Sequence, residues 1–552
     1  MPLYYAALLG FSTVTRLLLD AGAEVNAEGG YNGNALQAAS DGGYEQVVKT
    51  LLKAGAEVNA EGGEYGNALQ AASARGHEQV VKTLLDAGAE VNAQGGRYGN
   101  ALQAASWGGH EQVVKTLLNA GAEVSAQGGV YGNALQAASY GGHKQVVKTL
   151  LDAGAEVNAQ GGHFGNALQA ASVGGHEQIV KMLLNAGAEV NAQGGHFGNA
   201  LQAASVGGHE QVVKTLLDVG AEVNAQGGHF GNALQAASYG GHKQVVKTLL
   251  DAGAEVNAQG GEYGNALQAA SYRGHEQVVK MLLNAGADVN AQGGEYGNAL
   301  QAASYRGHKQ VVKTLLDAGA EVNAQGGHFG NALQAASVGG HEQVVKTLLN
   351  AGAEVNAQGG VYGNALQAAS YGGHKQVVKT LLNAGAEVNA QGGHFGNALQ
   401  AASVGGHEQI VKTLLNAGAE VNAQGGVYGN ALQAASYGGH KQVVKTLLNA
   451  GAEVNAQGGH FGNALQAASV GGHEQIVKTL LNAGAEVNAQ GGVYGNALQA
   501  ASYGGHKQVV KTLLDAGAEV NAQGGHFGNA LQAASVGGHE QVVKMLLDAG
   551  AY

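Results

Sequence analysis

Small and apolar residues alternate with polar ones along the chain in a pattern typical of short helices. Within residues 331–363, the run 332–337 consists mostly of strong helix formers and is followed by Val338 and two glycines. The next segment places Val344, Val345 and Leu348 at positions i, i+1 and i+4, which forms an apolar stripe on one helical face. The pattern therefore predicts two short helices, the first rich in alanine and the second amphipathic.

Both helices are bounded by residues that favour helix ends. Asn331 is a good N-cap, so the first helix is expected to begin there and to end near Gly339. The second helix is expected over about residues 341–351, with Gly352 at the position of a left-handed C-cap. The polar, glycine-rich residues 353–363 indicate a turn or short hairpin, which we call the finger.

The same sequence recurs every 33 residues along the whole chain. The first Asn of the repeat stands at Asn34 and at every period up to Asn529, which gives sixteen full repeats and a truncated seventeenth. A period of this length indicates that each repeat buries its apolar face only against its neighbours. We therefore predict one continuous array of about seventeen repeats over residues 1–552, beginning at Met1 and truncated after Gly550.

The two ends of the chain carry the packing residues of internal repeats. Leu3 stands near one end and Leu546 near the other, whereas terminal repeats of an array normally present a polar outer face. We therefore expect the chain to be part of a longer protein.

Several residues are shared by nearly all repeats and form a motif. In the repeat that begins at Asn331 it consists of Asn-Ala-Leu-Gln-x-Ala, Gly340-His341, Leu348-Leu349 and Ala351-Gly352-Ala353-x-Val355-Asn356. This motif resembles the ankyrin repeat, and the first repeat also keeps that family's proline, as Pro2. The resemblance implies an all-α ankyrin-repeat solenoid of stacked helix pairs with projecting hairpin-like fingers. The form Gly-Asn-Ala-Leu-Gln-Ala-Ala-Ser is similar to that of ankyrin arrays attached to fungal NACHT-type (NLR-like) signalling ATPases.

The finger departs from the familiar ankyrin sequence. Gly359 stands where the family has Asp, Asn and Gln replace its Thr and His, and an aromatic residue such as Phe329 or Tyr362 stands where many ankyrins have Gly. The resemblance implies that the family's hydrogen bonds between adjacent fingers are weakened, so we expect a softer stack of fingers. We expect the aromatic residues to stack on one another.

Composition narrows the possible functions. The chain has no Cys, one Pro and a formal net charge of -12, and its Lys residues are evenly dispersed. Without a basic stripe for phosphates, a nucleic-acid partner is not expected, and no apolar run is long enough to span a bilayer. We expect a cytoplasmic protein with a protein partner, no membrane association and no small-molecule substrate.

Two residue patterns could suggest chemistry, and neither is favoured. Ser337, His341 and Glu342 could form a catalytic set, but the Ser and His recur in fifteen repeats and the glycines between them are expected to break the helix. Finger histidines such as His163 and His196 are expected to lie too far apart to share a zinc ion. No Gly-x-x-x-x-Gly-Lys-Ser/Thr loop occurs. We therefore expect no catalysis, no metal and no cofactor.

Three positions vary most between otherwise near-identical repeats. They lie three residues before the first Asn of a repeat, as Arg97 does, and seven and eight residues after it, as Trp107 and Arg75 do. The ankyrin resemblance places them on finger tips and first-helix ends, which line the concave face and contact partners. Neutral drift at exposed sites is the alternative, but Tyr, Trp and Arg dominate binding hot spots. We predict a partly exposed aromatic row and assign to partner binding Arg97, Trp107, Tyr140, Tyr239, Tyr272, Arg273, Tyr305, Arg306, Tyr371, Tyr437 and Tyr503.

Two further patterns predict ion pairs. The repeats with Glu at the finger tip are the only ones with Arg at the eighth position, which predicts the pairs Glu64–Arg75, Glu262–Arg273 and Glu295–Arg306. From Lys309 to Glu540 the residue after the recurring His alternates between Lys and Glu, which would set each Lys between two Glu of adjacent helices. Recent copying of a 66-residue double repeat would also explain this alternation.

The sequence favours a non-catalytic protein–protein interaction scaffold that forms the recognition array of a larger signalling protein. A free-standing cytosolic ankyrin adaptor is the main alternative, and an enzyme is a distant third. No motif names the partner.

Overall fold

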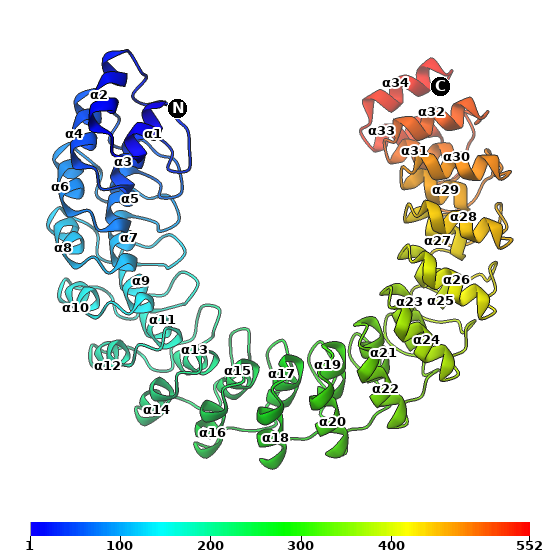
Figure 1. The fold of residues 1–552 in the computed structure, drawn as a ribbon, viewed down its shortest axis with the longest axis horizontal. Helices are drawn as coiled ribbons and strands as arrows, with labels where there is room; N and C mark the ends of the chain where they lie inside the picture. Colours follow the sequence, from blue (N-terminus) through cyan, green and yellow to red (C-terminus); the bar gives the residue numbers. More distant parts are fainter. Residues whose placement is uncertain (1) are drawn as a thin grey trace. The chain divides into compact units, whose positions relative to one another are not determined.

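The computed structural model describes residues 2–552. Every regular secondary-structure element in that range is an α-helix (Figure 1). These 34 helices form pairs, one pair for each 33-residue repeat, which confirms the predicted all-α architecture. The chain divides into two compact halves. The first half runs to Ala270 and includes Lys280–Ala287, and the second consists of Ser271–Val279 and Asp288–Tyr552.

The first half contains eight complete helix pairs. They are α1 (Pro2–Leu8) and α2 (Ser12–Asp20), α3 (Ala35–Asp41) and α4 (Glu45–Lys53), α5 (Ala68–Arg75) and α6 (Glu78–Asp86), α7 (Ala101–Gly108) and α8 (Glu111–Asn119), α9 (Ala134–Gly141) and α10 (Lys144–Asp152), α11 (Ala167–Val173) and α12 (Glu177–Asn185), α13 (Ala200–Gly207) and α14 (Glu210–Asp218), and α15 (Ala233–Gly240) and α16 (Lys243–Asp251). The helices α17 (Ala266–Arg273) and α18 (Glu276–Asn284) contribute residues to both halves.

The second half also contains eight complete pairs. They are α19 (Ala299–Tyr305) and α20 (Lys309–Asp317), α21 (Ala332–Val338) and α22 (Glu342–Asn350), α23 (Ala365–Tyr371) and α24 (Lys375–Asn383), α25 (Ala398–Val404) and α26 (Glu408–Asn416), α27 (Ala431–Tyr437) and α28 (Lys441–Asn449), α29 (Ala464–Val470) and α30 (Glu474–Asn482), α31 (Ala497–Tyr503) and α32 (Lys507–Asp515), and α33 (Ala530–Val536) and α34 (Glu540–Asp548).

The first helices pack closely because their buried positions hold small residues. Ala335 and Ala336 of α21 are fully buried, and α21 packs against both neighbouring first helices, α19 and α23. The second helix α22 buries the predicted stripe of Val344, Val345 and Leu348. Each repeat therefore completes its core only through the repeats on either side.

The predicted helix ends are confirmed. The Asn331 side chain accepts a hydrogen bond from the Gln334 backbone N–H at 2.9 Å, and Gln334 Oε1 accepts one from Asn331 N–H at 3.0 Å. This reciprocal arrangement is a capping box, in which the side chain of Gln334 satisfies the backbone of its own helix N-terminus. After α22, Gly352 adopts the left-handed conformation with φ of +91°.

Each finger is a minimal hairpin held by glycine backbone. Gly359 N–H donates to Gly363 O at 2.7 Å, and the two glycines form an isolated antiparallel bridge. The predicted stacking of the finger aromatics is confirmed, since the rings of Tyr362 and Phe395 in successive fingers lie 6.1 Å apart with an interplanar angle of 25°. Burial in this stack raises the pKa of Tyr362.

Hydrogen bonds that hold the fingers are present although the family's Asp and His are replaced, and a softer finger stack stays a prediction. Gln334 Nε2 donates to Ala357 O at 3.1 Å and to Gly363 O at 2.8 Å, which attaches the first helix of one repeat to the following finger. Val361 N–H also donates to His328 O of the preceding finger at 3.2 Å. The amide of Gln334, which replaces the family's His, therefore supplies the links that the sequence departures had put in doubt.

Candidate functional site

The variable finger-tip residues of the first half form a column because their backbones are joined. Arg97 N–H donates to Glu64 O at 3.0 Å, and His163 N–H donates to Val130 O at the same distance two fingers further on. The side chains meet as well, since Arg97 Nη1 lies 3.5 Å from Glu64 Oε1. Arg97 is exposed and lies where the sequence predicted a partner-binding residue.

Trp107 and Tyr140 lie over the buried stack of finger rings. The Trp107 ring is half-buried, and its centroid lies 5.1 Å from that of Tyr98. Tyr140 is 38% exposed and stacks on Phe164 with 4.5 Å between the ring centroids. Both side chains are therefore held against the finger rings while part of each stays exposed to solvent.

The tyrosines of the second half repeat this arrangement. Tyr371 is 39% exposed and stacks on Phe395 with 4.6 Å between centroids. The same contact, at 4.5 Å, joins Tyr305 to Phe329, Tyr437 to Phe461 and Tyr503 to Phe527. Tyr437 and Tyr503 are exposed, whereas Tyr305 is half-buried.

Tyr239 and Tyr272 are half-buried members of the same set. The Tyr239 ring lies 5.0 Å from that of Tyr263 in the first half, and the Tyr272 ring lies 4.7 Å from that of Tyr296 in the second. Partial exposure of the predicted aromatic positions is thus observed. Their contact with a partner stays a prediction.

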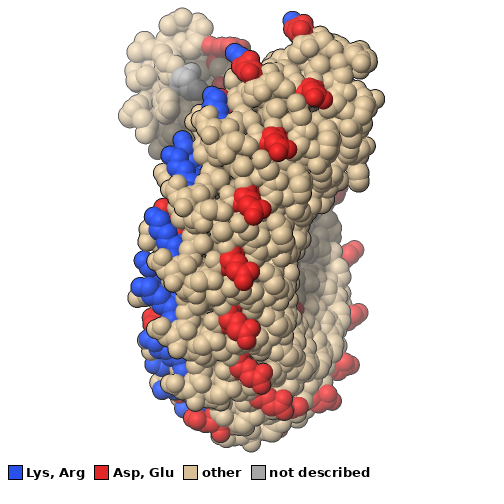
Figure 2. Space-filling model, turned by 90° about the vertical axis from the view of Figure 1, so that its right-hand side faces the viewer, with Lys and Arg blue, Asp and Glu red and all other residues tan. Residues whose placement is uncertain are grey.

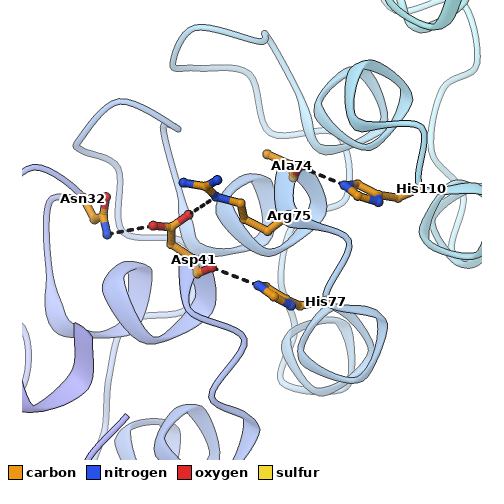
Figure 3. A network of polar contacts seen from close by, with 6 residues as sticks. All are labelled: Asn32, Asp41, Ala74, Arg75, His77 and His110. Atoms are coloured by element: carbon orange, nitrogen blue, oxygen red, sulfur yellow. Dashed lines mark hydrogen bonds and ion pairs between the residues drawn. The ribbon is translucent and has the colours of Figure 1, made fainter. Parts of the chain in front are cut away.

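Arg75 forms an ion pair with a residue of the preceding repeat. Its Nε lies 2.7 Å from Asp41 Oδ1, and Asn32 Nδ2 donates to Asp41 Oδ2 at 3.3 Å (Figure 3). Hydrogen bonding to this carboxylate raises the pKa of Arg75. The predicted Glu64–Arg75 pair is wrong, because the eighth position of a repeat lies beside the seventh position of the preceding repeat. Since Arg75 is exposed, its ion pair contributes no more than about 1 kcal/mol.

The same offset between neighbouring repeats explains the contact that Arg306 makes. Its guanidinium carbon lies 5.0 Å from the ring centroid of Tyr272, the seventh-position residue of the preceding repeat. Arg306 therefore makes a cation–π contact in place of the predicted ion pair with Glu295. Arg273 is exposed, and its pairing with Glu262 stays a prediction.

The alternating Lys and Glu residues do not link adjacent helices as predicted. Glu342 pairs with Lys346 on its own helix at 2.6 Å, the favourable i, i+4 arrangement. Lys309 instead donates to Gln343 Oε1 of the following repeat at 3.4 Å. Lys309 therefore forms no ion pair with Glu342, because the carboxylate of Glu342 is already paired with the nearer Lys346.

The Ser and His of the possible catalytic set do not contact each other. The Ser337 side chain is fully buried, and His341 Nε2 donates to Tyr305 O at 2.9 Å. Because a carbonyl oxygen can only accept, Nε2 carries the proton and that nitrogen cannot act as a base. This geometry agrees with the expectation that the set is structural.

The recurring histidines predict a loss of stability in weak acid. Burial lowers the pKa of His110, His308 and His341, and the hydrogen bond that each donates to a carbonyl offsets this only in part. Below the ordinary histidine pKa of about 6.5, the unfolded chain therefore binds more protons than the folded chain. The stability that these neutral histidines contribute is fully present above about pH 6.5. It is lost as the pH falls through their lower folded-state pKa values.

We expect the urea midpoint of unfolding to be lower at pH 5.5 than at pH 7.5. The comparison ends at pH 5.5 to keep clear of the ordinary range of carboxylate titration, near pH 4. An equal or higher midpoint at pH 5.5 would contradict this effect of histidine burial.

Finger histidines of the first half stack on one another and pair with a finger carboxylate. The ring centroids of His163 and His196 lie 5.1 Å apart, and His229 Nε2 lies 2.7 Å from Glu262 Oε2. Within residues 2–552 no group of three or more His, Cys, Asp or Glu side chains could hold a metal ion. No helix in the described part of the chain is long and apolar enough to cross a membrane.

Family models match nearly the whole chain. The model described as ankyrin repeats (3 copies) matches residues 1–62, 102–194, 134–227, 168–260, 200–293, 233–326, 267–359, 300–392, 332–425, 365–458, 398–491 and 464–552, and ankyrin repeats (many copies) matches residues 69–118. The chain therefore belongs to the ankyrin-repeat family, whose members are typically non-catalytic protein-binding scaffolds.

A solved structure is also similar to part of the chain. The crystal structure of the human ASB11 ankyrin repeat domain is 27% identical, and the match covers 40% of this chain and 98% of that chain with a TM-score of 0.36. No curated protein matches the chain.

Proposed function

We propose that this chain is a non-catalytic scaffold that binds a protein partner along its finger tips and first-helix ends. The observation that carries the proposal is the contrast between the constant buried residues, which we call the frame, and the variable surface. The frame is nearly identical in every repeat and consists of buried Ala, Leu and Gln and stacked finger rings. The seventh position varies most and carries the partly exposed aromatic side chains.

The geometry of these side chains suits recognition. A ring such as that of Tyr140, stacked on Phe164, is already ordered before a partner binds, so little conformational entropy remains to be lost. Rigid aromatic residues and Arg are also the side chains that most often dominate binding energy. The region from Arg97 to Tyr140 combines Arg, Trp and Tyr in neighbouring repeats and is our strongest candidate for a specific site.

The test begins with affinity purification of a partner on the intact chain and its identification. Binding of that partner is then measured for the double variant Trp107→Ala and Tyr140→Ala, together with its thermal unfolding. We expect binding to weaken at least about tenfold, which corresponds to the loss of one hot spot. Unfolding should change little, because both side chains are partly exposed.

A matched control is available at Val219, which is exposed and stands where most other repeats have Ala. Val219→Ala should leave both binding and unfolding unchanged. Full binding by the double variant would assign the variability to neutral drift, and loss of its fold would assign Trp107 and Tyr140 to the core.

We further propose that this array is the recognition part of a larger signalling protein, on the basis of its sequence similarity to arrays of fungal NACHT-type ATPases. The alternative is a free-standing cytosolic adaptor. An ATPase segment encoded upstream in the same transcript would support the first, and a transcript that encodes the array alone would support the second. Measurable turnover of a substrate would be needed to support an enzyme.

A further inference from the structure

The surface of the second half repeats every 66 residues as well as every 33. Exposed Tyr371, Tyr437 and Tyr503 occupy the seventh position in alternate repeats, and Val404 and Val470 occupy it in the repeats between them. The fingers alternate in step, with a tip valine before each tyrosine and a tip histidine after it, as in Val361, Val427, Val493, His394, His460 and His526. One combination of side chains therefore occurs three times.

Each combination is built in the same way. The Tyr371 ring lies between two finger rings, 5.7 Å from Tyr362 and 4.6 Å from Phe395 between centroids. The fingers on either side are joined, since His394 N–H donates to Val361 O at 2.9 Å. Val361 is 40% exposed and occupies the variable finger-tip position, although it was not among the individual residues assigned to binding. The 66-residue alternation was the signal that could have identified it.

This surface carries no formal charge. From Val355 to His374, which spans the finger and the first helix, the chain contains no Asp, Glu, Lys or Arg. From Lys309 to Asp548, charged residues are confined to the second helices and the turns after them. Figure 2 shows Lys and Arg in one row and Asp and Glu in another. A charged partner segment would lose hydration here without gaining an opposite charge, so the surface favours an uncharged occupant.

The spacing along the finger column identifies the shape of that occupant. The stacked rings of Tyr362, Phe395 and Tyr428 lie 6.1 and 6.5 Å apart. An extended peptide advances about 6.6 Å for every two residues, and those two residues bring the next side chain to the same face. One repeat therefore matches two residues of an extended peptide, and two repeats match four.

Other regular conformations fit less well. A polyproline II helix returns to the same face after three residues and about 9.3 Å, which matches neither one repeat nor two. An α-helix advances about 6 Å in four residues but turns by about 40° beyond a full circle, so its contact residues leave the surface within a few repeats. Of these three conformations, the extended segment is the one that stays in register with successive fingers.

We infer that the second half binds an extended, uncharged segment of a protein partner, with a large apolar side chain at every fourth residue seated beside Tyr371, Tyr437 and Tyr503. This inference rests on the proposed scaffold function and adds the chemistry of the partner. Because the three sites lie on one rigid frame, their contributions combine in a single binding event.

The test uses the full chain and synthetic peptides that span the three tyrosines. The probe has Leu at every fourth position among Ser and Thr. The first comparison peptide has the same composition as the probe, but its Leu residues stand at every third position. The second keeps the Leu spacing of the probe and has Lys and Glu in place of some Ser residues. We expect the probe to bind at least about tenfold more tightly than either comparison peptide.

The matched variant replaces all three tyrosines with Val, the residue that Val404 and Val470 already place at this position, so the fold is retained. The triple change Tyr371→Val, Tyr437→Val and Tyr503→Val should weaken probe binding at least about tenfold. The reverse changes Val404→Tyr and Val470→Tyr should tighten binding of a peptide with Leu at every second position.

Equal binding of the three peptides, or unchanged probe binding by the triple variant, would overturn the inference. So would an absence of peptide binding together with self-association of the chain that the triple variant abolishes, since the occupant would then be a second copy. The scaffold proposal is judged separately, by binding of a purified partner to the Trp107 and Tyr140 variant. It would survive any failure of the peptide experiment.

Discussion

Replacing Gly363 with Ala is expected to lower the opening free energy of its finger by about 3 kcal/mol or more. Gly363 has φ of +95°, a conformation that costs an L side chain about 1–2 kcal/mol. An added Cβ would also overlap Gln367 Oε1 and lie 2.8 Å from the carbonyl carbon of Gly392 in the next finger. Backbone cannot yield as a flexible side chain can, so the finger stack itself must shift.

Gly352 is the matched control for this substitution. Its φ of +91° is nearly the same, but an added Cβ would meet nothing within 4 Å. Gly352→Ala should therefore cost only the conformational part, about 1–2 kcal/mol. Native-state hydrogen exchange measures the opening of individual repeats and is preferable to a single midpoint, because long arrays do not unfold in one step. Equal effects of the two changes would show that fingers are not closely packed.

The helices and their ends could be predicted because the signals for them lie within one repeat. Asn331 begins the first helix, Gly352 follows the second, and the Val344 stripe faces the core, each within a few residues of the expected position. The stacking of finger aromatics could also be predicted, since identical side chains at one position of a stacked repeat must lie near one another.

Contacts between segments far apart in the chain could not be predicted, because they depend on how helices, fingers and neighbouring repeats pack. Glu64 and Arg75 vary together in the sequence, yet Arg75 contacts Asp41 and Glu64 contacts Arg97. The sequence shows Gln334 only as a residue that replaces the family's His, whereas its hydrogen bond to Gly363 joins residues 29 positions apart. Knowledge of which positions in neighbouring repeats lie side by side was the missing element.

The candidate surface was predicted in part. The exposed tyrosines were identified from their variability, and Tyr371 and Tyr140 lie as expected on an ordered ring stack. The finger-tip valines occupy a position that the sequence marked as variable, but none was assigned to binding because a Val in one sequence does not reveal whether it is buried. The spacing between fingers, on which the choice of an extended partner depends, is a property of the packed array alone.

Replacing Gln334 with Ala is expected to destabilise its repeat and the following finger by about 3 kcal/mol. The side chain loses three hydrogen bonds: Oε1 accepts from Asn331 N–H, and Nε2 donates to Ala357 O and Gly363 O. Gln334 is fully buried, so water cannot readily replace these bonds, and each unsatisfied buried group costs about 1–3 kcal/mol. Hydrogen exchange of the finger amides in residues 357–363 should report the loss.

Gln532→Ala serves as the control. Gln532 is exposed and its Oε1 accepts the same capping hydrogen bond, from Asn529 N–H at 3.1 Å, but its Nε2 donates to no following finger in residues 2–552. We expect this change to cost about 1 kcal/mol, the value of a cap alone. If Gln334→Ala cost no more than Gln532→Ala, the links from the first helix to the finger would not contribute to stability.

Gln334→Glu separates the two roles of the side chain. A carboxylate can still accept from Asn331 N–H, so the cap is preserved, but it cannot donate to the carbonyl oxygens of Ala357 and Gly363. Because two acceptors would then face each other in a buried place, we expect Gln334→Glu to be at least as destabilising as Gln334→Ala. The damage should centre on the finger and leave the start of α21 protected. Fraying of α21 with an intact finger would instead assign the main role of Gln334 to the cap.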